Sequence, residues 1–341
     1  MDGSEFAELL SSLLEVSQRA APGELPTLVQ DATRQLGLLD AAVYLADVQQ
    51  LSLIPLSAET VEESMRGVGV STPALTMDGT LAGWAYRTGS PQLTSGSSLV
   101  MWLPLVEGVE RIGVLRFTAP SLDGPMLERC KALASLVARL VASKAGFSDL
   151  IMSRVRTRPM TIQAELAWAF MPPRTIGTRN VTCSAVLEPA YEIGGDAFDH
   201  SLTAHTLHVT VVDAMGHDLA SGLSAAVAMA GCRSSRRAGG SLADITATVD
   251  EALNQWLPEH LLTAVFADLD LETGALTWVN CGHPPPSRGP RRPRTRGAAP
   301  ARHQPPSRPP HAEHHPPRPA GTRRPHSHPH RRCHRSPIGH R

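Results

Sequence analysis

The last 58 residues constrain most strongly what this 341-residue chain can fold into. Residues 284–341 hold 14 Arg, 16 Pro and 9 His, but only one acidic residue, Glu313, and one aliphatic residue larger than alanine, Ile338. Such a segment has almost no apolar surface to bury, so it cannot build a hydrophobic core. We therefore predict an Arg/Pro/His-rich disordered tail over 287–341, and any fold must come from the residues before it.

The formal net charge of zero hides two unlike parts. Without the tail, residues 1–283 carry 18 basic and 31 acidic side chains, a net charge of −13. The body is therefore acidic and the tail strongly basic. A basic tail can bind nucleic acid or an acidic surface. This one contains no aromatic residue on which bases could stack, so nucleic acid is not an expected partner.

The remaining composition predicts a cytoplasmic protein. No apolar run reaches the roughly 18 residues that span a bilayer, because Arg139 and Lys144 interrupt the nearest candidate. The first residues are acidic, where a secretory signal needs a basic start. The five cysteines are odd in number and scattered, which argues against a disulfide framework and against zinc-type pairs.

The first part of the chain has the pattern of an α+β domain, expected over residues 1–146. Apolar residues at helical spacing predict helices over 5–16, after Pro26, and over 122–145. Between them lie runs typical of an antiparallel sheet. The predicted strands cover residues 42–45, 51–56, 100–106 and 113–119.

This domain resembles a GAF domain, a small sensor module. Most of the resemblance is carried by Asp78–Ala85, with Leu103–Leu105 and Gly113–Leu115. These motifs are short, and GAF domains bind different ligands or none, so no ligand-binding residue follows from them. Aromatic and thiol side chains here are interpreted as core residues rather than as a ligand site: Trp84, Tyr86, Trp102 and Cys130.

Residues 147–170 are expected to form a helical linker, interrupted at Pro159. A helix between a sensor and an output domain can transmit a shift or a dimer rearrangement. A passive spacer fits the sequence equally well.

A second domain is predicted over 171–286. Strands are expected at 181–187, 205–212, 263–269 and 275–280, and helices at 219–232 and 242–256. Asp196 and Asp213 fall at junctions between glycine-containing turns and strands, where the backbone can approach a small ligand closely. Carboxylates with free carbonyls beside them suit a hard cation such as Mg²⁺ or Mn²⁺. Without a His/Cys cluster, zinc is not expected.

Each motif alone has a simpler explanation, because Gly-Gly-Asp occurs in ordinary turns and Asp213 could cap the following helix or the turn before it. The ordered set, however, resembles the PPM-type serine/threonine phosphatases of the bacterial sporulation and stress-response branch, over about residues 160–285. The motifs are Pro189-Ala190, Gly194-Gly195-Asp196 with Asp199, Asp213-Ala214-Met215-Gly216-His217, Leu262-Thr263-Ala264 with Phe266, and Asn280-Cys281-Gly282-His283 with Pro285.

The resemblance implies a β-sandwich flanked by helices, with two Mn²⁺ or Mg²⁺ ions at one edge. It implies a metal-dependent protein phosphatase under GAF-like control, in which ion-activated water attacks phosphorus in line. The expected partners are a phosphorylated anti-sigma-factor antagonist, as substrate, and a second copy of the chain; no membrane is expected. The implied catalytic residues are Asp196 and Asp213, the metal ligands are these two and the carbonyl of Ala214, and the supporting residues are Gly195, Gly216 and His217.

The sequence departs from this family after about residue 286. The family continues into strands with an Asp-Gly motif and a late metal-binding Asp, whereas no Asp follows Asp270 here. Asp268 and Asp270 belong to a predicted strand and its turn and are not assigned as ligands. The sandwich is therefore expected to be truncated.

Two explanations of the tail stay open: out-of-frame translation of a GC-rich gene, or a genuine basic tail. The alternative function is a catalytically inert phosphatase-like protein, in which only the GAF-like module senses a ligand or dimerises.

Overall fold

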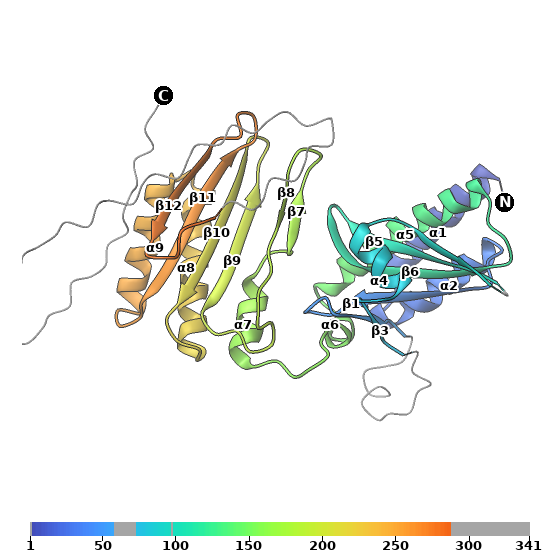
Figure 1. The fold of residues 1–341 in the computed structure, drawn as a ribbon, viewed down its shortest axis with the longest axis horizontal. Coiled ribbons are helices and arrows are strands. Elements are labelled where there is room, and N and C mark those ends of the chain that lie inside the picture. The colour runs from blue at the N-terminus through green and yellow to red at the C-terminus, as the bar shows by residue number, and fades with distance from the viewer. Residues whose placement is uncertain (1, 58–72, 97, 288–341) are drawn as a thin grey trace, which may run out of the picture. The chain divides into compact units, whose positions relative to one another are not determined.

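A computed structural model describes residues 2–57, 73–96 and 98–287 (Figure 1). By their internal contacts these residues divide into two compact units. The first runs to Met160 and includes Pro173–Thr178; the second comprises Thr161–Pro172 and the described residues from Arg179 onward. The predicted tail, from residue 288 on, lies outside the described residues.

The first unit contains a six-stranded antiparallel sheet with strand order β3-β2-β1-β6-β5-β4. Residues along its strands alternate between two buried faces, as in β5, where Met101, Leu103 and Leu105 point to one side. The strands are β1 (Asp40–Ala46), β2 (Ser52–Pro55), β3 (Leu75–Thr76), β4 (Gln92–Ser95), β5 (Leu99–Glu107) and β6 (Glu110–Ala119).

Helices cover both faces of this sheet. Leu13, Val29 and Leu133, from three different helices, join the main core on one face, whereas Ala85 and Tyr86 pack with Tyr44 on the other. The main-core helices are α1 (Gly3–Arg19), α2 (Leu25–Gln35) and α5 (Gly124–Ala145), the opposite face carries α4 (Leu81–Thr88), and the unit also contains η1 (Pro22–Glu24) and α6 (Asp149–Val155).

The second unit contains a four-stranded antiparallel sheet with order β12-β11-β10-β9. One face packs on two helices through small and apolar residues such as Val212, Phe266 and Ala228. The small residues of the first of these helices let the pair approach closely, because a methyl group at Gly231 would lie 3.3 Å from Val249. The elements are β9 (Asp196–Leu202), β10 (Thr206–Ala214), β11 (Leu262–Asp270), β12 (Leu276–Cys281), α8 (Leu219–Arg237) and α9 (Leu242–Trp256).

Helix α7 (Ile162–Phe170) belongs to this second unit, where the indole Nε1 of Trp168 donates to the carbonyl of Ala190 at 2.8 Å. The segment expected as one interrupted helical linker is thus two helices, α6 and α7, which lie in different units. Strands β7 (Thr175–Gly177) and β8 (Thr182–Ser184) are not part of the two larger sheets.

The α+β fold class is confirmed, with two differences in detail. The described part of the second unit has one four-stranded layer with helices on one face, so no second large sheet completes a sandwich within it. Trp84 was predicted in the core, but its side chain is 54% exposed on α4, so that prediction was wrong. Tyr86 and Cys130 are buried as expected, and Trp102 is partly buried against Tyr44.

Candidate functional site

Asp196 and Asp213 lie directly opposite each other on neighbouring strands. Asp196 opens β9, Asp213 is the next-to-last residue of β10, and the antiparallel register pairs the two. Directly opposed residues point to the same face, with Cβ atoms about 4.5–5.5 Å apart. Both side chains are exposed at this edge of the sheet. The fold therefore brings together the two acids that the motifs singled out.

The two carboxylates are not neutralised by basic side chains. The pKa of Asp196 is raised because its carboxylate is partly desolvated by the surrounding chain, although the residue is exposed, and because Asp213 places a negative charge and a hydrogen-bonding carboxylate beside it. His283 counteracts part of this shift. Among the described residues, no ion pair involves either acid. A like-charge pair of this kind favours binding of a cation or a proton.

Glycines allow the segment before Asp196 to pack closely against the loop Asp213–His217. A methyl group on Gly195 would lie 2.1 Å from the carbonyl oxygen of Ala214, and one on Gly194 would lie 2.5 Å from the Cα of His217. Gly216 has φ +107°, in the region that disfavours other residues. The predicted supporting glycines thus hold the Asp213–His217 loop against the residues that precede Asp196.

His217 lies in this loop with its side chain exposed. Its carbonyl oxygen accepts a hydrogen bond from the side-chain amide of Gln163, on α7, at 3.4 Å. The helix that follows is capped by Asp218, whose carboxylate accepts from the backbone N–H of Ser221. Asp213 is therefore not the N-cap of α8.

His283 lies near the acids, although the sequence motifs predicted no role for it. Thr263, the residue opposite Asp213 on β11, shares a hydrogen bond of 2.9 Å between its Oγ1 and Nδ1 of His283. His283 is part of the Asn280-Cys281-Gly282-His283 motif, so the sequence marks the residue. The motif does not show which strand the imidazole approaches.

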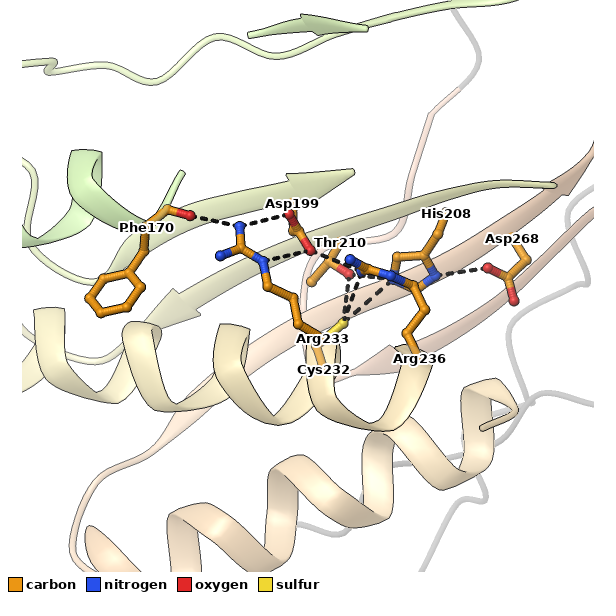
Figure 2. A network of polar contacts seen from close by, with 8 residues as sticks. All are labelled: Phe170, Asp199, His208, Thr210, Cys232, Arg233, Arg236 and Asp268. Atoms are coloured by element: carbon orange, nitrogen blue, oxygen red, sulfur yellow. Dashed lines mark hydrogen bonds and ion pairs between the residues drawn. The ribbon is translucent and has the colours of Figure 1, made fainter. Parts of the chain in front are cut away.

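A buried ionic network on the helix-facing side of the sheet was also missed (Figure 2). Asp199 on β9 is 2% exposed and accepts hydrogen bonds from Arg233 and Arg236 of α8, at 2.8–3.2 Å. Burial alone would raise the pKa of Asp199, but the two guanidinium groups outweigh it and lower this pKa. Arg233 also donates to the carbonyl of Phe170 at 2.6 Å, so the network ties β9, α8 and the end of α7 together.

His208 continues this network on β10. Its Nδ1 lies 2.8 Å from a carboxylate oxygen of Asp268, and its Nε2 lies 2.7 Å from the hydroxyl of Thr210 and 3.5 Å from the sulfur of Cys232 (Figure 2). Burial lowers the pKa of His208, but the hydrogen bonds to Asp268 and Cys232 outweigh it and raise the pKa to about 9. The ring is therefore a buried cation at neutral pH.

The donors at the edge fit the start of a divalent-cation site. The two carboxylates and the neighbouring carbonyl of Ala214 are oxygen ligands of the kind that Mg²⁺ and Mn²⁺ prefer. Within residues 2–57, 73–96 and 98–287, no cluster of three or more His, Cys, Asp or Glu side chains has metal-binding geometry. The described residues thus supply two acids, fewer than a two-ion centre of the predicted family uses.

No helix in the described parts of the chain is both long and apolar enough to cross a membrane.

Comparisons with known proteins give matches to both units. A family model described as Stage II sporulation protein E matches residues 203–305. This range includes Asp213, His217 and His283 but begins after Asp196, and it runs past residue 287 beyond the described residues. A comparison with curated proteins gives no match.

Among solved structures, the GAF domain of an Acinetobacter phosphoenolpyruvate-protein phosphotransferase is 10% identical, covering 44% of this chain and 99% of that chain, with a TM-score of 0.35. A GAF domain of the corresponding Coxiella burnetii protein is 14% identical, covering 42% and 97%, with a TM-score of 0.34. A Stage II sporulation E family protein from Thermanaerovibrio acidaminovorans is 24% identical, covering 25% and 45%, with a TM-score of 0.23. Similarities at this level assign no ligand or activity.

The family match agrees with the ordered motifs and with the paired acids at the sheet edge. The resemblance predicted from the sequence is confirmed: the chain is similar to GAF domains over its N-terminal part and matches the family model described as Stage II sporulation protein E over residues 203–305.

Proposed function

We propose that this protein is a metal-dependent serine/threonine phosphatase regulated by its GAF-like unit. The observation that carries the proposal is the pairing of Asp196 with Asp213 across β9 and β10, where the described residues form no ion pair with either acid. The match to a sporulation-phosphatase family supports the reaction class.

In this proposal the chain's own residues bind and orient the ions and the substrate. Asp196, Asp213 and the carbonyl of Ala214 would hold Mn²⁺ or Mg²⁺. Because Gly195 has no side chain, the carbonyl of Ala214 can lie close to it. When bound, the ions lower the pKa of a water molecule and offset the charge of the phosphate. The glycine contacts keep the two acid-bearing segments packed against each other, so little reorganisation is needed on binding.

For the substrate we propose a phosphoserine or phosphothreonine on an anti-sigma-factor antagonist. This part rests on the resemblance, because the branch of phosphatases that the motifs match acts on such proteins. The position of the GAF-like unit before the phosphatase domain supports regulation by a ligand or by dimerisation.

The test of the proposal is hydrolysis of p-nitrophenyl phosphate by the full chain with and without added Mn²⁺. We expect Mn²⁺-dependent turnover that Asp213→Asn lowers by at least about 100-fold, as expected when a ligand of a catalytic metal is lost. Asp270→Asn is the matched control, because Asp270 is the exposed last residue of β11 and its carboxylate accepts hydrogen bonds only from Glu272 and Thr273 in the turn that follows.

A second candidate is a catalytically inert phosphatase-like protein. It is favoured by the finding that the described residues bring only two acids to the edge, without a third His, Cys, Asp or Glu that completes a metal cluster. Folded protein that neither binds Mn²⁺ nor hydrolyses the ester would support this candidate and reject the phosphatase.

A further inference from the structure

The backbone and ring of His283 are fixed by two neighbouring strands. The backbone N–H of His283 donates to Oδ1 of Asn280 at 2.8 Å, and Nδ2 of Asn280 donates back to the carbonyl of His283 at 2.8 Å. Nδ1 of the ring lies 2.9 Å from the hydroxyl of Thr263 on β11. Gly282, at φ +82°, makes the turn that carries the ring back from β12 towards β11. The imidazole is therefore held in one orientation.

This orientation places the ring beside the two acids. Thr263 is the direct partner of Asp213 in the β10–β11 register, and Asp213 is the direct partner of Asp196 in the β9–β10 register. The three side chains form a row on one face of the sheet, because direct partners in an antiparallel pair share a face. His283 lies close enough to Asp196 to lower the pKa of that carboxyl. The ring is thus on the exposed, acid-bearing side.

A threonine hydroxyl can donate or accept a hydrogen bond, so the contact with Thr263 is compatible with either tautomer of the His283 ring. In the tautomer in which the hydroxyl donates to Nδ1, the ring hydrogen is on Nε2. No hydrogen bond to Nε2 is found among the described residues. In that tautomer the ring presents an oriented N–H donor beside the two carboxylates, whose charge bound cations would offset.

We propose that His283 is a substrate-binding residue, which donates a hydrogen bond from Nε2 to an oxygen of the substrate's phosphate group, with Thr263 and Asn280 as its positioning residues. The proposal rests on the phosphatase function proposed above and adds a contact to it. The donor in this proposal is the Nε2–H of the ring, whose position is fixed by the contacts with Thr263 and Asn280.

The test compares His283→Ala and His283→Gln with the wild-type full chain. Glutamine keeps an N–H donor at a similar reach, so it separates loss of the donor from loss of the ring. His205→Ala is the control, because His205 lies in the exposed turn between β9 and β10, at the other end of the strands, and contacts Glu272. Each variant is measured for Mn²⁺ binding by electron paramagnetic resonance, for inorganic phosphate binding to the Mn²⁺-loaded protein by calorimetry, and for kcat and KM with p-nitrophenyl phosphate.

We expect His283→Ala to weaken phosphate binding about 10- to 100-fold, as for a lost hydrogen bond to a charged group, and to raise KM while Mn²⁺ binding stays unchanged. His283→Gln should restore most of the phosphate affinity, and His205→Ala should match the wild type. Unchanged phosphate affinity in His283→Ala would overturn the proposal, and so would a His283→Gln variant as weak as His283→Ala.

The two proposals can fail separately. If Asp213→Asn abolishes turnover but the His283 variants bind phosphate normally, only the role of His283 is wrong. If the wild type binds no Mn²⁺, the phosphatase function fails and the role of His283 fails with it.

Discussion

Asp196 and Asp199 lie on the same strand but on opposite faces of the sheet, and their surroundings differ sharply. Asp199 faces α8, where two arginines lower its pKa. Asp196 faces the exposed side, where burial and Asp213 raise its pKa. A carboxylate buried in a core needs partners within the chain. A carboxylate that lies beside a second negative charge at an exposed edge is stabilised when a cation binds there.

His208 makes the stability of the second unit depend on pH. Its pKa in the folded chain is about 9, above its value of about 6.5 in an unfolded chain. The stabilisation should therefore be fully present below about pH 6.5 and be lost as the pH rises through about 9. The charged groups that face the ring are Asp268 and, across the sulfur of Cys232, Arg236.

We expect the free energy of unfolding of the second unit to fall by up to about 3 kcal/mol between pH 6.5 and 9. Urea denaturation at several pH values measures this slope. His208→Gln should remove most of the slope, whatever its own effect on stability, while His205→Gln should keep it because that side chain is exposed. A wild-type stability that does not change over this range would contradict the prediction.

Gly195 should be intolerant of any side chain. A methyl group there would lie 2.1 Å from the backbone oxygen of Ala214, and a backbone contact cannot be relieved by rotating a side chain. We expect Gly195→Ala to destabilise the second unit by about 1–3 kcal/mol and to weaken Mn²⁺ binding, measured by denaturation and electron paramagnetic resonance.

Gly146→Ala is the matched control for this substitution. Nothing lies within 4 Å of the added methyl group, and φ at Gly146 is −66°. It should leave stability unchanged or raise it slightly. If Gly195→Ala kept the Mn²⁺ affinity and the stability of the wild type, the backbone at Gly195 would not be packed against that of Ala214 as described.

At the residue scale, the sequence predicted the acids and glycines of the site but not the network behind them. Asp196 and Asp213 stand in motifs of fixed order, so they can be recognised one strand at a time. Asp199 and Arg233 come from a strand and a helix that are distant in the sequence, and no local pattern marks such a pair. The placement of His283 beside Thr263 likewise depends on the β11–β12 register.

At the scale of elements, periodicity predicted most helices and strands. α9 has the predicted bounds, and β10, β11 and α8 differ from their predictions mainly at their ends. β9 was missed because Asp-Ala-Phe-Asp-His-Ser-Leu lacks apolar alternation. Its polar residues are accommodated by partners elsewhere, such as Arg233 and Arg236 for Asp199, and those partners appear only in the folded chain.

The residue that caps α8 lies next to the loop that carries Asp213. Asp218 caps the helix through the N–H of Ser221 and directly follows the loop that carries Asp213. A lost cap leaves the first N–H groups of a helix unsatisfied. We expect Asp218→Ala to speed amide hydrogen exchange in the first turn of α8 and to weaken Mn²⁺ binding.

Asp123→Ala is the matched control for this cap, because Asp123 caps α5 of the first unit in the same way, through the N–H of Met126. It should speed exchange at the start of α5 and leave α8 and Mn²⁺ binding unchanged. Equal protection of α8 in Asp218→Ala and in the wild type would contradict the role of this cap.

At the scale of the whole molecule, charge and burial divide the chain in different ways. The charge division falls near residue 284, where the acidic body gives way to the Arg-rich segment. The burial division falls inside the body, where the apolar clusters of the two units have no member in common. Composition could predict the first division, because it needs only residue counts. The second needs the tertiary contacts that assign α6 and α7 to different units.

Separate cores predict separate unfolding. Leu133 is fully buried in the core of the first unit, and Phe266 is 1% exposed in that of the second. Leu133→Ala should cost about 2–5 kcal/mol and Phe266→Ala about 3–5 kcal/mol, through lost burial and an unfilled cavity. In calorimetry of the full chain, each variant should lower the midpoint temperature of one unfolding transition and leave that of the other unchanged. A core substitution destabilises the cooperative unit that contains it. If either variant shifted all of the unfolding heat together, the two units would form one cooperative fold.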